Sequence, residues 1–433
     1  MFLKHLRIQN LRSIEDIEID FADIQGNRKW TLIAGENGTG KSSILKAIAL
    51  ALSGSNAFPK LADGMDTWIR NGESSAKIDI TISTKTGKKR DISLVLKRDS
   101  NLREFLHSNN EGLSKIDDAI EKADQNYFIA AYGPYRYSAS KNENVMSSPN
   151  SSSPRADSVR SLFNKVTPLN SLTDWAVNQH YVDGEQGLEV VREAVSKLLP
   201  DISLVEVDKK RKELIFETVD GMVSFNQLSD GYQNMATWIG DLLSRITSAF
   251  SHYENPLHAR GLILIDEIDA HLHPGWRRRL REFIDKTLPN FQLVATTHSA
   301  MTLQQSAEDE VFLLSRNTNN RVELNSFPGD PSKLRLYQIN DLAFNIRSSN
   351  SFEYEQKREL LETALLDETV NSKLSAADRE LLGAKQTLLG SSGETDLEAT
   401  NPAMKTYMDS VKDLRLSLEQ KYKNKGLEKD DRN

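Results

Sequence analysis

One stretch of nine residues decides the fold of this chain: Gly35-Glu36-Asn37-Gly38-Thr39-Gly40-Lys41-Ser42-Ser43. It matches the phosphate-binding pattern G-x-x-x-x-G-K-S, with both glycines, the lysine and the first serine at the required spacing. The apolar run 30–34 predicts a buried strand before it, and residues 42–53 carry apolar side chains at helical spacing after it. The stretch is therefore predicted to lie at a strand-to-helix junction, the context that phosphate binding requires.

Each residue type in this stretch has a role in binding a phosphate, and we expect all nine residues to line the site. Glycines let backbone amides approach phosphate oxygens, and the amino end of the next helix adds partial positive charge. Lys41 is predicted to reach the β- and γ-phosphates of ATP, and the Ser42 hydroxyl to face Mg²⁺. A glycine-rich turn with a chance Lys-Ser pair is disfavoured because the pattern and its context agree.

Length and composition limit the class of protein. At 433 residues the chain is long enough for two or three lobes, each with its own core. It has no cysteine, which excludes disulfides and thiolate metal sites and fits a reducing cytosol. No apolar run approaches about 18 residues, so we expect a soluble, cytoplasmic protein without membrane contact. The net charge of −7 gives no overall attraction to nucleic acid, so any such contact must come from local basic patches.

Hydrophobic periodicity predicts alternating strands and helices along the chain. The expected strands outside the junction are 2–10, 14–21, 76–84, 91–97, 126–132, 202–207 and 213–218. A segment rich in Ser, Asn and Pro, 138–158, is expected to be a loop or lobe boundary. The expected helices beyond it are 159–166, 169–181 and 185–199.

Two acidic residues follow an apolar strand further along the chain. The run 261–265 ends in Asp266-Glu267. ATP hydrolysis needs one acid to hold the Mg²⁺ shell and a second to orient and polarise the attacking water, and we assign these roles to Asp266 and Glu267 respectively. A further strand, 291–296, leads to His298. Because parallel strands present their carboxyl ends at one sheet edge, this histidine is expected beside the phosphates.

A fourth motif, LSDGYQ at 228–233, opens a predicted helix. The order of the nine-residue loop (Walker A), LSDGYQ (signature), LILIDE at 262–267 (Walker B) and THSA at 297–300 resembles the ABC ATPases of the SMC/RecF/OLD branch. The opening LRIQNLRSIEDIEIDF at 6–21 is similar to the first strands of that branch. The resemblance covers about residues 1–310.

This resemblance implies an α/β fold, a P-loop head of the ABC type. Such a head has a mixed sheet around the Walker A and B helices and a helical signature lobe, with an α-helical C-terminal extension here. The family implies a dimer with two ATPs, each between the Walker A of one protomer and the signature of the other. Ser229 and Gly231 would then contact the γ-phosphate of the partner's ATP. His298 would be the switch histidine, Asp269 would lie in the loop across the dimer interface, and Arg12 would approach the phosphates.

The sequence departs from the family pattern in several places. Asp230 and Tyr232 occupy the variable positions of the signature. No glutamine follows strand 126–132, where the family's Q-loop residue would lie, and 132–136, YGPYR, leaves that role unassigned. Sustained heptads are missing, so the long coiled coil of SMC proteins is not expected. No D-x-D follows His298, as the Toprim domain of OLD nucleases would need, so we do not expect this chain to cut DNA.

The motifs predict four regions. Residues 1–135 form ATPase lobe I with Walker A, and 136–250 form the helical lobe with the signature. Residues 251–340 complete the core with Walker B, the D-loop and the switch histidine, and 341–433 form a helical accessory region. Its expected helices are 352–366, 376–389 and 402–426. The last helix either packs on the head or docks on a partner, and its sequence favours neither.

The local basic runs at 85–90 and 277–281 are candidates for nucleic-acid contacts. A solvated surface explains both runs better, and a nucleic-acid contact is the alternative. His271 and His273 resemble the D-loop of this branch, and without a cysteine or third ligand no metal site is expected there.

The compact head, the sequence IDEIDAHLHP at 265–274 and the lack of a nuclease motif most resemble the stand-alone ATPase subunits of Septu-type anti-phage systems. That resemblance implies a switch or sensor subunit that hydrolyses ATP with Mg²⁺, forms a homodimer or a higher oligomer, and regulates a separate HNH-type nuclease. The alternative enzyme is a RecF-like DNA repair ATPase. The alternative that is not an enzyme is a scaffold, which binds ATP but does not hydrolyse it.

Overall fold

The structure is a computed structural model that describes residues 1–22, 26–61, 64–83, 87–122, 127–136, 153–198, 202–208, 213–270 and 272–346. The described residues belong to one compact unit, Met1–Arg347, and the rest of the chain, Ser348–Asn433, lies outside them. The three predicted C-terminal helices, most of the predicted loop 138–158, and His271 lie outside the described residues.

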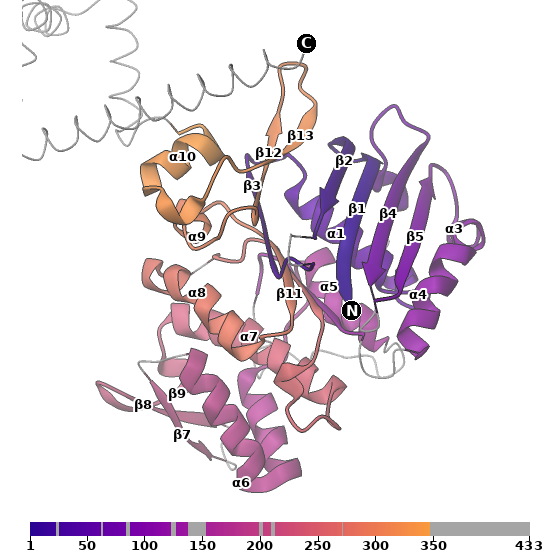
Figure 1. The fold of residues 1–433 in the computed structure, drawn as a ribbon. Helices are drawn as coiled ribbons and strands as arrows, with labels where there is room; N and C mark the ends of the chain where they lie inside the picture. Colours follow the sequence, from indigo (N-terminus) through magenta and orange to yellow (C-terminus); the bar gives the residue numbers. More distant parts are fainter. Residues whose placement is uncertain are drawn as a thin grey trace, which may run out of the picture. The chain divides into compact units, whose positions relative to one another are not determined.

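A six-stranded sheet forms the centre of this unit, in the order β13-β12-β3-β11-β10-β6 (Figure 1). Five strands are parallel: β3 (Trp30–Gly35), β6 (Ile129–Tyr132), β10 (Leu262–Ile265), β11 (Gln292–Thr296) and β12 (Val311–Arg316). The edge strand β13 (Val322–Ser326) pairs antiparallel with β12. The predicted mixed sheet is confirmed, and its strands read as apolar runs because both faces are covered.

A second, antiparallel sheet has the order β2-β1-β4-β5. Its strands are β1 (Phe2–Leu11), β2 (Ile14–Asp20), β4 (Ser75–Ser83) and β5 (Lys89–Lys97), which confirms the strands predicted from alternation. Helix α1 (Lys41–Leu52) contacts strands of both sheets, and nearly all its side chains are buried. The helix after Walker A is therefore the shared core of two sheets, which fixes the loop that precedes it.

Helices flank these sheets. α2 (Phe58–Leu61) and α5 (Pro154–Phe163) contact each other, while α3 (Leu102–Ser108) and α4 (Asn110–Lys122) cover β5. α5 begins earlier than the predicted 159–166 because Ser153 caps it, with its hydroxyl accepting from the Ala156 amide, and Pro154 suits the first turn.

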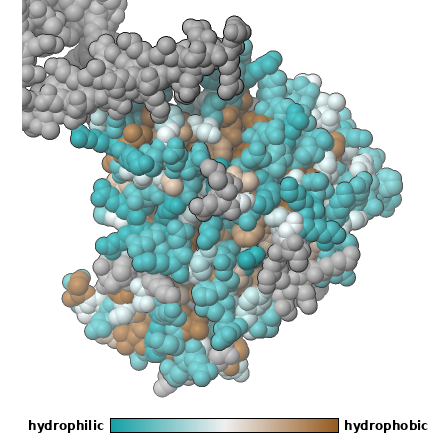
Figure 2. Space-filling model, in the orientation of Figure 1, coloured by the Kyte–Doolittle hydropathy of each residue, from teal (hydrophilic) through white to brown (hydrophobic). Residues whose placement is uncertain are grey.

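The signature lobe contains α6 (Leu172–Leu198), α7 (Asp230–Ala249) and a small sheet of β7 (Ser203–Asp208), β8 (Glu213–Thr218) and β9 (Gly221–Ser224). Non-helical Gly184, with φ 61°, divides α6 near the predicted break at 181–185. The strand β9 was not predicted because it is short and has little buried surface. Figure 2 shows a largely hydrophilic face, with hydrophobic side chains gathered over this lobe.

The remaining helices are α8 (Pro274–Thr287), α9 (Ala300–Leu303) and α10 (Leu336–Phe344). The core lies on both faces of the six-stranded sheet, because consecutive residues such as Leu32 and Ile33 point to opposite faces and belong to different hydrophobic clusters. Among the described helices, none is long and apolar enough to cross a membrane.

Candidate nucleotide-binding site

The Walker A loop connects β3 to α1, and its glycines are required by the packing around it. Gly35 has φ 143°, and a Cβ there would lie 2.0 Å from the carbonyl oxygen of Leu314 on β12. Gly40 has φ 109°, and a Cβ there would lie 2.8 Å from Ser13 Oγ. Gly38, by contrast, has open space where its Cβ would be. The loop is therefore pressed against its own chain at both ends and open at its tip.

Lys41 is folded over the loop. Its Nζ donates to the carbonyl oxygens of Gly35 at 2.9 Å and Glu36 at 2.7 Å. Burial lowers the pKa of Lys41 to about 8, against the opposing effect of Asp266, Glu267 and Glu36. The ammonium group is thus already desolvated, which favours its exchange of carbonyl partners for an anion.

The rest of the loop leaves backbone amides open to an anion. Glu36, Asn37 and Gly38 are exposed, whereas Thr39 and Ser43 are buried. Gly40 caps α1 without a side-chain bond, so the first amides of the helix are left for an anion. Ser42 is half-buried in the first turn of α1.

Arg12 lies in the turn between β1 and β2, at φ 52°. Its guanidinium carbon is 4.6 Å from the centroid of the Trp68 ring, and burial lowers its pKa. The neighbouring Ser13 Oγ donates to the Thr39 carbonyl oxygen at 3.2 Å. This turn therefore packs against the Walker A loop, and the approach of Arg12 to the phosphates stays a prediction.

The acid pair follows β10, as predicted. Thr296 Oγ1 at the end of β11 donates to Asp266 Oδ1 at 2.6 Å and accepts from the Glu267 amide at 2.7 Å. Glu267 has φ 50°, a left-handed conformation that is uncommon for a residue with a side chain. One threonine thus orients both acids, and the sequence analysis had given it no role.

His298 is exposed just beyond β11, and its ring stacks on Phe344 of α10 at 6.4 Å. Partial burial and the charge of Lys41 lower the pKa of His298, so the neutral ring is favoured at pH 7. Asp269 is buried, and its two carboxylate oxygens accept from Thr297 Oγ1 at 2.9 Å and Thr302 Oγ1 at 3.2 Å. Asp269 therefore ties the D-loop to its own chain, and its contact with a partner's nucleotide stays a prediction.

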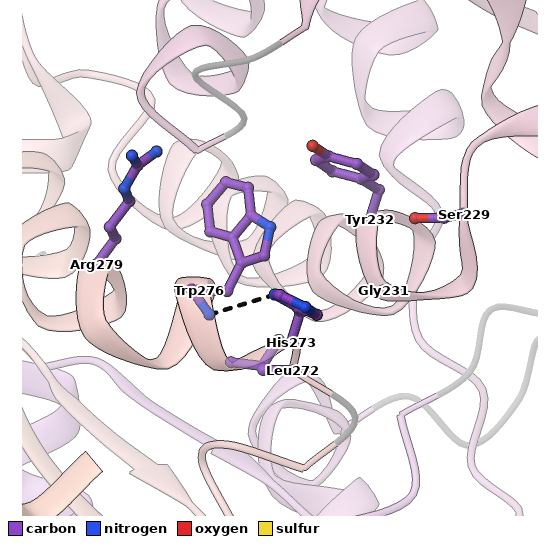
Figure 3. A pocket seen from close by; sticks show the side chains of 8 residues that line it. Ser229, Gly231, Tyr232, Leu272, His273, Trp276 and Arg279 are labelled. Carbon is purple, nitrogen blue, oxygen red and sulfur yellow. Dashed lines mark hydrogen bonds between the residues drawn. The ribbon is translucent and has the colours of Figure 1, made fainter. Parts of the chain in front are cut away.

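The signature lies on a separate surface. A cavity of about 800 Å³ is lined by Ser229, Gly231, Tyr232, Leu272, His273, Gly275, Trp276 and Arg279, with no Walker A residue among these described lining residues (Figure 3). Exposed Ser229 caps α7 without a side-chain bond, and nothing lies within 4 Å of a Cβ at Gly231. Within one chain, the signature and Walker A do not share this cavity.

The basic run at the start of α8 is partly structural. Arg277 donates to the Leu272 carbonyl and to Ser299 Oγ, and Arg281 makes a paired contact with Glu310. Arg278 and Arg279 are exposed, and Arg279 points toward the signature cavity in Figure 3. Arg277 and Arg281 are therefore occupied by contacts within the chain, which disfavours a nucleic-acid contact by the whole run 277–281.

Arg136 is a residue that sequence reasoning left unassigned. It is buried, and it donates to backbone carbonyls of the turn that carries Asp266 and Glu267. Burial lowers its pKa to about 10, while nearby Asp266 and Asp269 oppose the shift. Its position directly after β6, where the family has the Q-loop, was the available signal.

The residues at this sheet edge fit a magnesium nucleotide. The uncapped amino end of α1 and the buried Lys41 are donors for phosphate, and the space at Gly38 is open. The Ser42 hydroxyl and the Asp266 carboxylate are oxygen ligands of the kind that Mg²⁺ prefers. By contrast, no group of three His, Asp or Glu residues that could hold a metal occurs in the described ranges.

The chain is similar in sequence to two known proteins. "Septu protein PtuA" of Bacillus mycoides is 29% identical over 318 residues, 73% of this chain and 41% of that protein. "Septu protein PtuA" of Bacillus thuringiensis is 26% identical over 349 residues, 76% of this chain and 79% of that protein. The chain thus spans less than half the length of the Bacillus mycoides relative. The predicted resemblance to SMC/RecF-like ATPases of the Septu PtuA type is confirmed.

The solved SMC head domain from Thermotoga maritima is a more distant likeness. It has a TM-score of 0.42 and 14% identity, and covers 76% of this chain and 100% of that one. A family model matches residues 31–303, which run from β3 through α9 and make up more than half of the chain. The chain therefore belongs to the family described as "AAA domain, putative AbiEii toxin, Type IV TA system".

Proposed function

We propose that this chain is a cytoplasmic ATP hydrolase that forms an ATP-sandwich homodimer and acts as the switch subunit of a bacterial anti-phage defence complex. One observation carries the proposal. Lys41, the pair Asp266-Glu267 and His298 follow three neighbouring parallel strands and lie at one sheet edge, while the signature Ser229 faces a separate cavity.

The residues at the sheet edge divide the chemistry among them. Lys41 and the first amides of α1 bind the phosphates, and Ser42 and Asp266 would hold Mg²⁺, which would neutralise charge that develops on the phosphates. Glu267 lies beside Asp266 and accepts the proton of the attacking water. His298, which is favoured in its neutral form, hydrogen-bonds to the transferred phosphate.

The second half of each site comes from another copy of the chain. Ser229 and Gly231 stand at the amino end of the 20-residue helix α7, where a small side chain and a glycine allow close approach of an anion. A two-fold dimer then completes two equal sites. Asp269 holds the loop beside this interface.

The defence role rests on the similarity to "Septu protein PtuA". The resemblance stated from the sequence adds a separate HNH-type nuclease as the partner, and higher oligomers of the ATPase. Binding and hydrolysis of ATP would set the activity of that nuclease. A RecF-like repair ATPase is the alternative.

The test uses the full chain in two measurements. Mass photometry with Mg²⁺ and ATP should show an ATP-dependent dimer, and phosphate release should require Mg²⁺. A neighbouring HNH gene product, where the genome has one, should copurify with the chain and cut DNA only in its presence. Absence of phosphate release would favour the scaffold, and a stable ATPase that neither binds nor controls a nuclease would favour repair.

A further inference from the structure

Arg136 holds the backbone of the acid pair through hydrogen bonds to its carbonyls. Its side chain is 6% exposed. Nη2 donates to the carbonyl oxygens of Asp266 and, at 2.7 Å, Glu267, while Nη1 lies 3.5 Å from that of Ile268. Nε donates to the Gly133 carbonyl oxygen at 3.0 Å. One guanidinium group therefore spans three consecutive carbonyls of the turn after β10.

These contacts bear on the conformation of Glu267. Its φ of 50° is disfavoured for an L-residue, so the surrounding structure must maintain it. Thr296 Oγ1 binds its amide at 2.7 Å, and Arg136 binds its carbonyl. Both peptide groups of Glu267 are therefore fixed, and with them the direction in which its carboxylate leaves the backbone.

Arg136 also contacts the signature helix. Its guanidinium carbon lies 5.5 Å from the ring of Trp238 on α7, and the Tyr132 ring lies 5.9 Å from the same indole. The Tyr132 hydroxyl donates at 2.8 Å to Asp241, which lies three residues further along α7. The segment 132–136 thus touches both α7 and the turn that carries Glu267.

We propose that Arg136 is a positioning residue that keeps Glu267 in its working conformation and makes that conformation depend on the position of α7. This inference rests on the proposed ATP hydrolysis. Because α7 begins at the signature, a phosphate that reaches Ser229 would affect Glu267 through Trp238 and Arg136. The coupling runs through one packed chain of contacts, with no contact between Arg136 and the substrate required.

The experiment compares Arg136→Met and Arg136→Lys with a matched control, Arg281→Met. Arg281 also donates to a carbonyl, that of Gln305 at 2.8 Å, and lies over an indole, that of Trp30 at 5.5 Å. It differs in pairing with the Glu310 carboxylate, and it makes no hydrogen bond to residues 266–268. Arg136→Met should lower kcat about 10- to 100-fold, with ATP affinity within about threefold of wild type. Arg136→Lys should recover part of kcat, and Arg281→Met should lower Tm while keeping kcat.

Hydrogen exchange provides a measurement that does not depend on turnover. In Arg136→Met, exchange should increase in peptides covering 266–270, where the Ile268 and Ala270 amides are bonded to Thr296 and Glu267. Arg281→Met should not raise it there. Unchanged exchange at 266–270, or kcat within about twofold of wild type in folded Arg136→Met, would overturn the inference. If wild type releases no phosphate, the proposed function fails, while the exchange comparison still decides whether Arg136 holds this turn.

Discussion

The Walker A loop and the signature segment are two helix amino ends with glycines, and their surroundings differ. At the Walker A loop, Gly35 is packed against Leu314 and Lys41 is bonded to two carbonyls of its own loop. At the signature, Gly231 has open space around it and exposed Ser229 caps α7 without a side-chain bond. The first segment is packed against its own chain at Gly35 and Gly40, and the second has open space at Gly231.

This difference separates two properties of the proposed enzyme. A preformed loop with a desolvated lysine makes nucleotide affinity a property of one chain. In the proposed dimer, Ser229 and Gly231 line a cavity that no Walker A residue of their own chain lines, so we expect hydrolysis to be a property of two chains. Substitutions in the two regions should therefore change different measurements.

The largest expected effect separates binding from hydrolysis within the Walker regions. Lys41→Ala should weaken ATP binding about 100-fold or more, since a charge-assisted contact with the phosphates is lost. Glu267→Gln should keep binding and lower phosphate release about 10²- to 10⁴-fold, the usual contribution of a general base. Equilibrium nucleotide titration and phosphate release measure the two effects.

The control for these variants is Glu282→Gln, which removes an exposed acid that pairs with Lys286 on the surface of α8. It should match wild type in both measurements. Equal ATP affinity in Lys41→Ala and wild type would contradict the assigned role of the loop.

The next effect tests the packing difference directly. Gly35→Ala puts a Cβ 2.0 Å from a backbone oxygen at φ 143°, so it should lower the free energy of unfolding by about 3 kcal/mol or more. Gly231→Ala meets open space within a helix and should raise stability by up to about 1 kcal/mol. Denaturant unfolding measures both, and Gly231→Ala should weaken ATP-dependent dimerisation although the variant stays folded. Similar losses of stability in the two variants would remove the distinction.

A smaller effect comes from the titration of Lys41. Burial lowers its pKa to about 8 in the free chain, and bound phosphates would raise it again. Above pH 8, binding must therefore take up a proton, so the apparent ATP affinity should fall with rising pH, approaching tenfold per pH unit. Nucleotide titration from pH 7 to 10 measures the slope. Lys41→Arg keeps its charge over this range and should give a flat profile, and an equally flat wild-type profile would contradict the prediction.

Much of the fold could be predicted because its signals are local. The strands of the antiparallel sheet alternate along the chain, and β3, β10 and β11 are apolar runs that end in motif residues. Walker A, the acid pair and His298 could be assigned to one edge because parallel strands align their carboxyl ends.

The supporting contacts could not be predicted because they join residues distant in sequence. Arg136 meets the turn at 266–268, Thr296 joins both acids, and Phe344 stacks on His298. Nothing local marks Arg136 as the partner of carbonyls 130 and 131 positions away, or Thr296 as the partner of acids 30 and 29 positions away. The occupied carboxylate of Asp269 was hidden for the same reason.

The smallest expected signal is also the most direct test of the open signature. In a two-fold dimer each site takes Lys41 from one chain and Ser229 from the other, so Lys41→Ala and Ser229→Arg each disable both sites of a homodimer. In a mixed dimer, one site carries both defects and the other carries none. Random exchange at equal ratio makes half of the dimers mixed, so up to about a quarter of wild-type phosphate release should return.

The assay compares each variant alone with the mixture, and tagged subunits confirm that exchange has occurred. Strict coupling between the two sites would reduce the recovery, because both ATPs would then be needed before either is hydrolysed. Mass photometry of Glu267→Gln with ATP separates that case from a site built within one chain. A trans site predicts an ATP-dependent dimer that Ser229→Arg, added to the same chain, abolishes. If that double variant still dimerises with ATP and the mixture shows no recovery, the open signature is not the second half of the site.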